Sequence, residues 1–332
     1  MPDTHHLQQQ HLQWGAEALW QRLEPLLPGL SVEVVARTDS TNTQLLERAR
    51  RAGVHDEDTT SRTHGRRAGD AQPCLLVAES QTRGRGRQGK PWYSSPGASL
   101  TFSLSLPFSP ADWSGLSLAV GVAVAEALDP APAGRAPAIG LKWPNDLLLM
   151  DPVDGSKDPA VGSGDSAADS ADAATGFGRK LGGILIETVA MGPRRMAVIG
   201  IGLNVLPQAL KDLSLGYACL AELLPQADAP DVLARIAEPL VRTLNSFQRQ
   251  GFGPLQARYA ARDALAGRAV TTTLEGMPAG VAEGVDADGA LLVRGSDGLR
   301  HRISSGEVTV RVDAGTPPAP GRPDASDAPE TP

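Results

Sequence analysis

The sequence has few cysteines, no excess of positive charge and no long apolar run. Its two cysteines, Cys74 and Cys219, form no Cys-x-x-Cys pair and no Cys/His cluster, which excludes a zinc framework and is typical of a reducing compartment. The formal net charge of −7 argues against general nucleic-acid binding, because neutralising phosphates needs a basic face. No apolar run reaches membrane-span length, and the N-terminus lacks the regions of a signal peptide. These absences predict a soluble cytoplasmic protein.

The apolar content is ample for a core. Hydrophobic residues make up 41% of the 332 residues, which suggests one large domain and a smaller one. Much of the glycine and proline lies in polar stretches that cannot bury enough surface to offset their ordering entropy. We therefore predict disordered tails at 1–14 and 314–332 and disordered insertions at about 54–72 and 151–179. The remainder divides into a domain at 15–265 and a small one at 266–313.

Hydrophobic periodicity in the ordered parts predicts a mixed α+β domain followed by a small β-barrel-like unit. Apolar residues at helical spacing predict helices at 17–30, 39–53, 116–128, 231–252 and 253–265. Alternating or continuous apolar runs predict strands at 31–38, 74–80, 99–107, 139–150 (two strands around a turn), 180–189 and 195–206. Short β segments with turn signals at hairpin spacing follow at 268–274, 279–294 and 299–311.

The stretch "RGRGRQGKP", residues 83–91, fits three kinds of loop. A nucleoside-triphosphate P-loop needs a Ser or Thr after its lysine and then a helix, but Pro91 and a strand follow here. A dinucleotide-binding turn also needs a following helix, so that interpretation fails too. What remains is a loop whose cations, Arg83, Arg85, Arg87 and Lys90, would repel one another unless an anion binds. The alternative is a solvated hairpin tip.

Several other stretches are distinctive when taken together with this loop. They are "DSTN" (39–42), "KWPND" (142–146), "RKLGGILIE" (179–187) and "VIGIGLNV" (198–205). The ordered series, from about Val34 to Arg311, resembles the biotin protein ligases. The resemblance implies a mixed sheet flanked by helices, like that of class II synthetases, followed by an SH3-like β-barrel. It also implies that biotin and MgATP give biotinyl-5′-AMP and pyrophosphate, and that biotin then passes to a lysine of the biotin carboxyl carrier protein of acetyl-CoA carboxylase.

The resemblance assigns substrate-binding roles to several residues. Ser40, Thr41, Asn42 and Gln81 match biotin contacts, although the first three also suit a helix N-cap and Gln81 an ordinary strand end. Arg85, Gly86 and Arg87 match a loop that orders over the ligand, with both arginines neutralising the biotin carboxylate and the α-phosphate. Trp92 matches an aromatic on the adenine side, with a core aromatic as the alternative.

Lys180 is the strongest catalytic candidate, because a lysine there can bridge the carboxylate and the α-phosphate. Asp146 matches an acid that orients Lys180 or helps to deprotonate the incoming lysine, unless it only closes an Asx-turn. Nucleotide-side roles fall to Lys142, as a structural or phosphate-side residue, and to Asn204. Glu307 and Arg311 match contacts with ATP or the carrier, or a salt bridge that holds the β domain. The resemblance implies that magnesium enters as MgATP, and the sequence leaves open whether it contacts protein side chains or only phosphate oxygens.

The resemblance leaves some functions open. Fewer than forty residues precede "VVARTDSTN", and they contain no recognition helix or basic patch, so we expect a monofunctional ligase that does not bind DNA. A homodimer stays open as an assembly. The nearest rival function is a lipoate or octanoyl ligase or transferase of the same fold, and a rival of another class is a non-catalytic biotin-sensing regulator.

Overall fold

The computed structural model describes residues 12–56, 72–131, 134–150, 178–191, 194–208, 216–272, 279–304 and 311–312. Most of the predicted tails and insertions, and Glu307, therefore lie outside the described residues. The inner borders of these segments are ordered. Trp14 is buried, a helix continues to Asp56 and a strand begins at Arg179.

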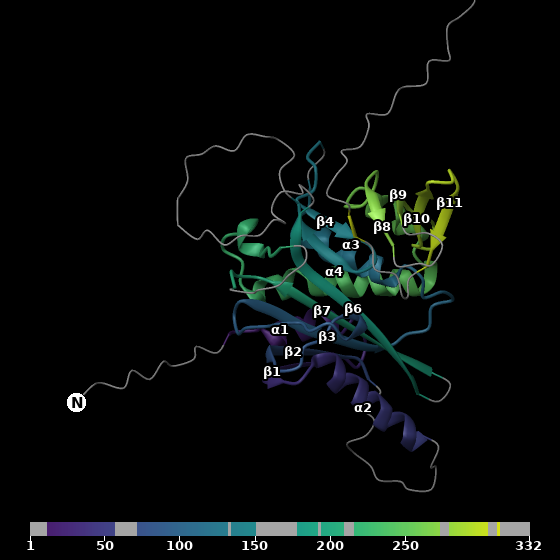
Figure 1. Cartoon of the computed structure of the whole chain (residues 1–332). Coiled ribbons are helices and arrows are strands. Elements are labelled where there is room, and N and C mark those ends of the chain that lie inside the picture. Colours follow the sequence, from purple (N-terminus) through teal and green to yellow (C-terminus); the bar gives the residue numbers. More distant parts are fainter. Residues whose placement is uncertain are drawn as a thin grey trace, which may run out of the picture.

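The large domain is built on a seven-stranded mixed sheet (Figure 1). The strand order is β1 (Ser31–Thr38), β2 (Cys74–Gln81), β3 (Ser99–Pro107), β7 (Arg194–Asn204), β6 (Arg179–Met191), β5 (Asp146–Leu149) and β4 (Ile139–Lys142). β1 and β2 are parallel, and the other neighbouring pairs are antiparallel. The predicted mixed sheet flanked by helices is confirmed.

Helices cover both faces of this sheet. Successive side chains of a strand point to opposite faces, and on this sheet both faces carry apolar side chains that the helices bury. Along β2, Leu75 and Val77 belong to the main core, whereas Cys74 and Leu76 belong to a smaller cluster on the other face. The main core contains buried residues of α1 (Ala16–Leu23), α3 (Leu116–Leu128) and α4 (Ala229–Gln250). The smaller cluster lies under α2 (Thr41–Asp56), which Figure 1 shows on the opposite side of the sheet from α4.

The C-terminal part forms a separate five-stranded antiparallel sheet, which confirms the predicted small β domain. Its strand order is β11 (Arg300–Ile303), β10 (Leu291–Gly295), β9 (Ala279–Val285), β8 (Ala269–Thr271) and β12 (Arg311–Val312). The two domains touch closely: the Trp143 indole donates to the Gly289 carbonyl at 3.1 Å, and a Cβ on Gly289 would lie 2.6 Å from the Gly115 Cα. Only a residue without a side chain fits there.

The helix boundaries differ from the predictions in three places. The first helix ends at Leu23 and not near residue 30, because prolines at 25 and 28 follow it. α2 continues through Gly53 to Asp56, so that glycine does not end the helix as predicted. The predicted helix 253–265 is only the short η5 (Gly253–Leu255) and α5 (Gln256–Ala260). After it, the backbone instead exchanges hydrogen bonds with Leu141 of β4.

Candidate functional site

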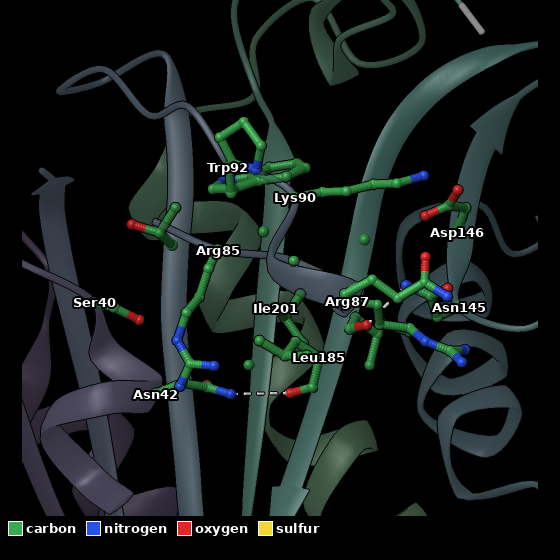
Figure 2. A pocket seen from close by; sticks show the side chains of 18 of the residues that line it. Ser40, Asn42, Arg85, Arg87, Lys90, Trp92, Asn145, Asp146, Leu185 and Ile201 are labelled. Atoms are coloured by element: carbon green, nitrogen blue, oxygen red, sulfur yellow. Dashed lines mark hydrogen bonds between the residues drawn. The ribbon is translucent and has the colours of Figure 1, made fainter. Parts of the chain in front are cut away.

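A pocket opens where the large sheet meets the start of α2, the 84–92 loop and the 142–146 turn (Figure 2). Eleven of the predicted site residues line it: Ser40, Thr41, Asn42, Gln81, Arg85, Gly86, Arg87, Trp92, Lys142, Asp146 and Lys180. These residues come from widely separated parts of the sequence. The structure therefore brings most of the predicted site together.

Glycines in β7 create the floor of the pocket. Below α2 this face of β7 carries Met196 and Val198, which fill the space under the helix. The next two positions on that face are Gly200 and Gly202. A Cβ at Gly200 would lie 2.3 Å from the Asn42 Oδ1, and one at Gly202 would lie 2.4 Å from the Trp92 ring. The two glycines thus let a polar and an aromatic side chain rest directly on the sheet.

The connection from the end of β1 to the start of α2 places the polar residues of "DSTN" at one end of the pocket. The Asp39 carboxylate accepts hydrogen bonds from the Ser40 amide at 2.7 Å and from the Gln44 side-chain amide at 2.9 Å. The Gln44 bond is the largest cause of a lowered pKa of Asp39. Ser40 Oγ accepts from the Thr43 amide at 3.4 Å, so Ser40 both caps α2 and lines the pocket.

Asn42 is buried and fixed in orientation by its neighbours. Its amide nitrogen donates to the Leu185 carbonyl at 3.2 Å and to Glu187 Oε2 at 2.9 Å. Its carbonyl oxygen can only accept, so the Ser103 hydroxyl 2.6 Å away must donate to it. Thr41 Oγ1 lies 2.6 Å from that same Ser103 Oγ and can donate to it. The Asn42 end therefore presents a prearranged set of neutral donors and acceptors.

Gln81, at the end of β2, completes this end of the pocket. Its side-chain carbonyl accepts from the Thr41 amide at 2.7 Å. That arrangement leaves the amide nitrogen of Gln81 beside Gly84, at the start of the loop. Polar groups that are mutually fixed in this way suit a small ligand with both donors and acceptors.

The 84–92 loop is closed by bonds within the chain. The Gly86 amide donates to the Lys90 carbonyl at 2.7 Å, and the Trp92 amide donates to the Gly84 carbonyl at 2.8 Å. A Cβ on Gly84 would lie 2.4 Å from the Trp92 carbonyl oxygen, so this position requires glycine. Gln88, inside the short η2 turn (Arg87–Gly89), has a positive φ of 55°.

The two predicted arginines of this loop point to different ends of the pocket. Arg85 extends toward the Asn42 end, where its Nη1 lies 2.9 Å from Glu187 Oε1 and its Nε donates to Thr43 Oγ1 at 3.2 Å. Figure 2 shows Arg87 on the opposite side, with Asn145 and Asp146. Burial lowers the pKa of Arg87, and the negative charge of Asp146 opposes that shift. Arg87 remains a cation, since an arginine titrates far above neutral pH.

Lys180 and Asp146 form the charged centre of the other end. The Lys180 Nζ donates to Asp146 Oδ1 at 2.7 Å, and both side chains are largely buried. Asn145 fixes the turn that carries Asp146. Its side-chain nitrogen donates to the Ile184 backbone carbonyl at 2.9 Å, and its backbone carbonyl accepts from the Ile184 amide. The register of the sheet puts Asp146 of β5, Gly183 of β6, Gly202 of β7 and Thr101 of β3 in one row across the strands. Two glycines without side chains therefore lie between Asp146 and Thr101. Asp146 and Lys180 thus border a part of the sheet where β6 and β7 carry no side chain.

Trp92 lies over this floor, against Gly202. Its ring nitrogen is buried and has no hydrogen-bond partner among the described residues. Such a donor, in a pocket that Arg87 and Lys180 also line, suits a ligand that carries both an anion and a ring with acceptor atoms. Lys142 also lines the pocket, at the end of β4.

Asn204 is close to the site but is not among the residues lining the pocket. Its side-chain nitrogen donates to the carbonyls of Lys180 at 3.2 Å and Ala218 at 3.0 Å, which holds the 216–218 segment against β6. Its nucleotide contact stays a prediction. The same is true of Glu307, outside the described residues, and of Arg311, for which the structure describes the backbone alone.

Three groups of functional interest were not predicted from the sequence. Glu187 was within a distinctive stretch, but nothing in its spacing indicated that it meets both Asn42 and Arg85. Ser103 is in a strand whose alternating serines gave no sign of a pocket. Gly200 and Gly202 were visible as "GIG" within a strand pattern, where glycine often marks a close approach.

The described residues set some limits on the chemistry. No group of three or more His, Cys, Asp or Glu side chains in this part of the chain is placed to hold a metal ion. No described helix is both long and apolar enough to cross a membrane. The pocket offers fixed neutral hydrogen-bonding groups at one end and an ion pair at the other. This arrangement suits a ligand with a neutral polar ring and a carboxylate, whose carboxylate would react with a phosphate group at the charged end.

Both domains match known protein families. Residues 34–204 match the Biotin/lipoate A/B protein ligase family, and residues 266–311 match the Biotin protein ligase C terminal domain. The first match contains every residue that lines the pocket. The second covers the small β domain from just before β8 to the start of β12.

Individual relatives are similar over most of the chain. Bifunctional ligase/repressor BirA of Escherichia coli (strain K12) is 31% identical over 291 residues, which are 86% of this chain and 75% of that protein. Biotin--[acetyl-CoA-carboxylase] ligase of Mycobacterium tuberculosis is 31% identical over 309 residues, 89% of this chain and 91% of the relative. The solved biotin protein ligase from Aquifex aeolicus, in complex with biotin and ATP, shares the fold with a TM-score of 0.60 at 23% identity, over 85% of this chain and 99% of that one.

Proposed function

This chain belongs to the Biotin/lipoate A/B protein ligase family, and we propose that it is an ATP-dependent biotin protein ligase. In the first step, a carboxylate oxygen of biotin attacks the α-phosphorus of ATP, and pyrophosphate leaves with the electron pair of the broken P–O bond. In the second step, a lysine amine of the biotin carboxyl carrier protein attacks the acyl carbon. AMP leaves, and the amine gives up a proton.

One observation carries this proposal: a single pocket joins a neutral hydrogen-bonding end to a charged end over a glycine floor. The ureido ring of biotin needs both donors and acceptors, which Ser40, Thr41, Asn42 and Gln81 supply in fixed positions. The valerate chain then leads its carboxylate away from that ring toward Lys180.

Activation depends on the charged end. We assign Lys180 to bridge the biotin carboxylate and the α-phosphate, where its fixed charge stabilises the negative charge of the transition state. Asp146 holds the Lys180 ammonium in place through the 2.7 Å hydrogen bond. Arg87 supplies a second cation at this end. We assign Trp92 and Lys142 to the nucleotide, with the adenine against the Trp92 ring and the phosphates toward Lys142.

Transfer needs a proton acceptor and exclusion of water. Asp146 is the acidic side chain placed at this end of the pocket, so we assign it to accept the proton of the carrier lysine. The 84–92 loop covers the mixed anhydride, because a closed site protects that bond from hydrolysis. Mg²⁺ enters with ATP as its phosphate counterion, and the reaction takes place in the cytoplasm, where ATP is available. A homodimer remains a prediction.

A direct labelling assay tests this function. The protein is incubated with MgATP, a biotin carrier domain, and either labelled biotin or labelled lipoate. We expect label on the carrier lysine from biotin and only when ATP is present. If lipoate labels the carrier and biotin does not, the substrate of this ligase is lipoate and the proposal of biotin is wrong. If neither compound labels the carrier, the ligase function itself is contradicted.

A further inference from the structure

Glu187 connects the 84–92 loop to the wall of the pocket. Its two carboxylate oxygens have different partners: Oε1 accepts from Arg85 Nη1 at 2.9 Å, and Oε2 accepts from Asn42 Nδ2 at 2.9 Å. Glu187 itself is not among the residues lining the pocket, and its side chain is 26% exposed. It therefore acts on two residues that line the pocket from a position behind them.

On the Asn42 side, Glu187 helps to fix which way the amide points. The Glu187 carboxylate and the Leu185 carbonyl can only accept, so together they select the nitrogen of Asn42 and turn its carbonyl toward Ser103. From Ser103 the contacts continue to the Thr41 hydroxyl, and the Thr41 backbone amide donates in turn to Gln81. One carboxylate thus sets the first member of a hydrogen-bond network that spans the neutral end of the pocket.

On the loop side, Glu187 anchors a segment that is already closed on itself. The Gly86–Lys90 and Gly84–Trp92 hydrogen bonds hold the loop as a compact unit. The Arg85 side chain, 34% exposed, joins that unit to β6 through Glu187 and to α2 through Thr43. All of these contacts are between groups of this chain.

We propose that Glu187 is a positioning residue that latches the 84–92 loop over the pocket through Arg85 while it orients Asn42. The proposal rests on the proposed function for its meaning in catalysis, whereas the latch itself joins groups of this chain and can be tested without any reaction. It also changes the role of Arg85. An arginine tied to Glu187 at the neutral end positions the loop, and Arg87 and Lys180 are left to neutralise the anionic ligand.

Limited proteolysis of the free protein tests the latch without any reaction. Trypsin cleaves after Arg or Lys unless proline follows, so the loop offers Arg83, Arg85 and Arg87, whereas Pro91 blocks cleavage after Lys90. Glu187→Gln keeps the size and an acceptor for Asn42 but removes the charge. We expect cleavage within 83–90 to become roughly tenfold faster, the effect of losing a partly buried charge-assisted bond. Equal cleavage rates in the two proteins would overturn the latch.

Glu33→Gln is the matched control. The Glu33–Arg48 pair also spans 2.9 Å, with side chains 38% and 28% exposed, but it joins β1 to α2 away from the loop. We expect Glu33→Gln to leave loop cleavage unchanged. Thermal unfolding of both variants shows whether each is folded. If both variants speed loop cleavage equally, the effect is general loosening and the proposal fails.

A double-mutant cycle with Arg85 tests the coupling during catalysis. Glu187→Gln should raise the KM for biotin roughly tenfold, leave kcat within about twofold, and leave the KM for ATP unchanged. Arg85→Met should do the same, and the double variant should be no worse than the worse single variant. Effects that multiply in the double variant would mean that the two residues act independently. A protein without ligase activity would still show the trypsin result, so the two failures can be told apart.

Discussion

The two ends of the pocket are built in opposite ways. At the Asn42 end, neutral groups bond to one another in a continuous network, and the Arg85–Glu187 ion pair beside it has its carboxylate behind the wall. At the Lys180 end, the charged groups Lys180 and Asp146 themselves line the pocket. A neutral ring is recognised by donors and acceptors that cannot turn, whereas a reacting phosphate needs charge at the surface. One cavity thus binds the ring of the ligand at its neutral end and carries out the reaction at its charged end.

Removing the charged group at the reactive end should have the largest effect. Lys180→Ala should lower the rate of biotinyl-AMP formation by ~10³-fold, because one preorganised transition-state contact is lost. Biotin binding should change by less than about threefold, since the ring contacts remain. Pyrophosphate release and equilibrium binding of labelled biotin measure the two quantities. Lys142→Ala is the control variant, and its rate of biotinyl-AMP formation should fall by less than about tenfold. Near-normal turnover of Lys180→Ala would remove Lys180 from the mechanism.

Arg87→Gly should separate formation of the adenylate from its retention. The substitution removes a cation beside Asp146, so we expect release of biotinyl-AMP to become roughly 10²-fold faster, as a charge-assisted contact to a bound anion is lost. Free adenylate in the medium and labelling of bystander lysines measure this release. Tight retention of the adenylate by the variant would contradict a role of Arg87 at the anionic ligand.

Two alanine substitutions on one strand should divide the two ends cleanly. Gly200→Ala places a Cβ 2.3 Å from Asn42 Oδ1, and Gly202→Ala places one 2.4 Å from the Trp92 ring. Each should raise one KM by roughly tenfold through overpacking: biotin for Gly200→Ala and ATP for Gly202→Ala. Each variant controls for the other, because both add one methyl group to β7. If both variants raise the same KM, the division of the pocket into two ends is wrong.

A substitution of Asp263 should change the stability of the fold without affecting substrate binding at either end of the pocket. Burial raises the pKa of Asp263 to about 6, and its Oδ2 has no partner among the described residues. Because the folded-state pKa exceeds that of the unfolded chain, its contribution to stability is full below about pH 4 and is lost as the pH rises through 6.

Asp263→Asn should therefore increase the free energy of unfolding at pH 8 by roughly 1–3 kcal/mol and change it much less at pH 4. Urea unfolding at the two pH values measures the difference. Both KM values should stay within about twofold of the parent protein's. An equal gain at both pH values would show that the charge of Asp263 is not the cause.

The sequence predicted the large elements of the fold well because alternation and helical spacing depend on local burial. The helix ends were harder, since α2 passes through Gly53 while the chain after Ala260 leaves its helix to bond with Leu141. Those outcomes depend on partners far away in the chain. Short-range patterns contain no information about such partners.

The same limit applies to the site. The motifs identified eleven residues that line the pocket, because each motif places its side chains at a strand end or a turn. Spacing alone could not divide Arg85 from Arg87, which are two residues apart but point to different ends. That division depends on the register of β6, which puts Glu187 beside Asn42. Long-range register is a property of the folded sheet.

The contact between Trp143 and Gly289 has a practical consequence for anyone who divides this protein. The turn that carries Asp146 begins with a tryptophan whose indole is held by the small β domain. A fragment ending at residue 265 would keep every residue that lines the pocket but lose the support beneath that turn. Two fragments cut near residue 265 should therefore regain activity only when something brings them together. The junction is a natural place to build a split reporter of molecular proximity.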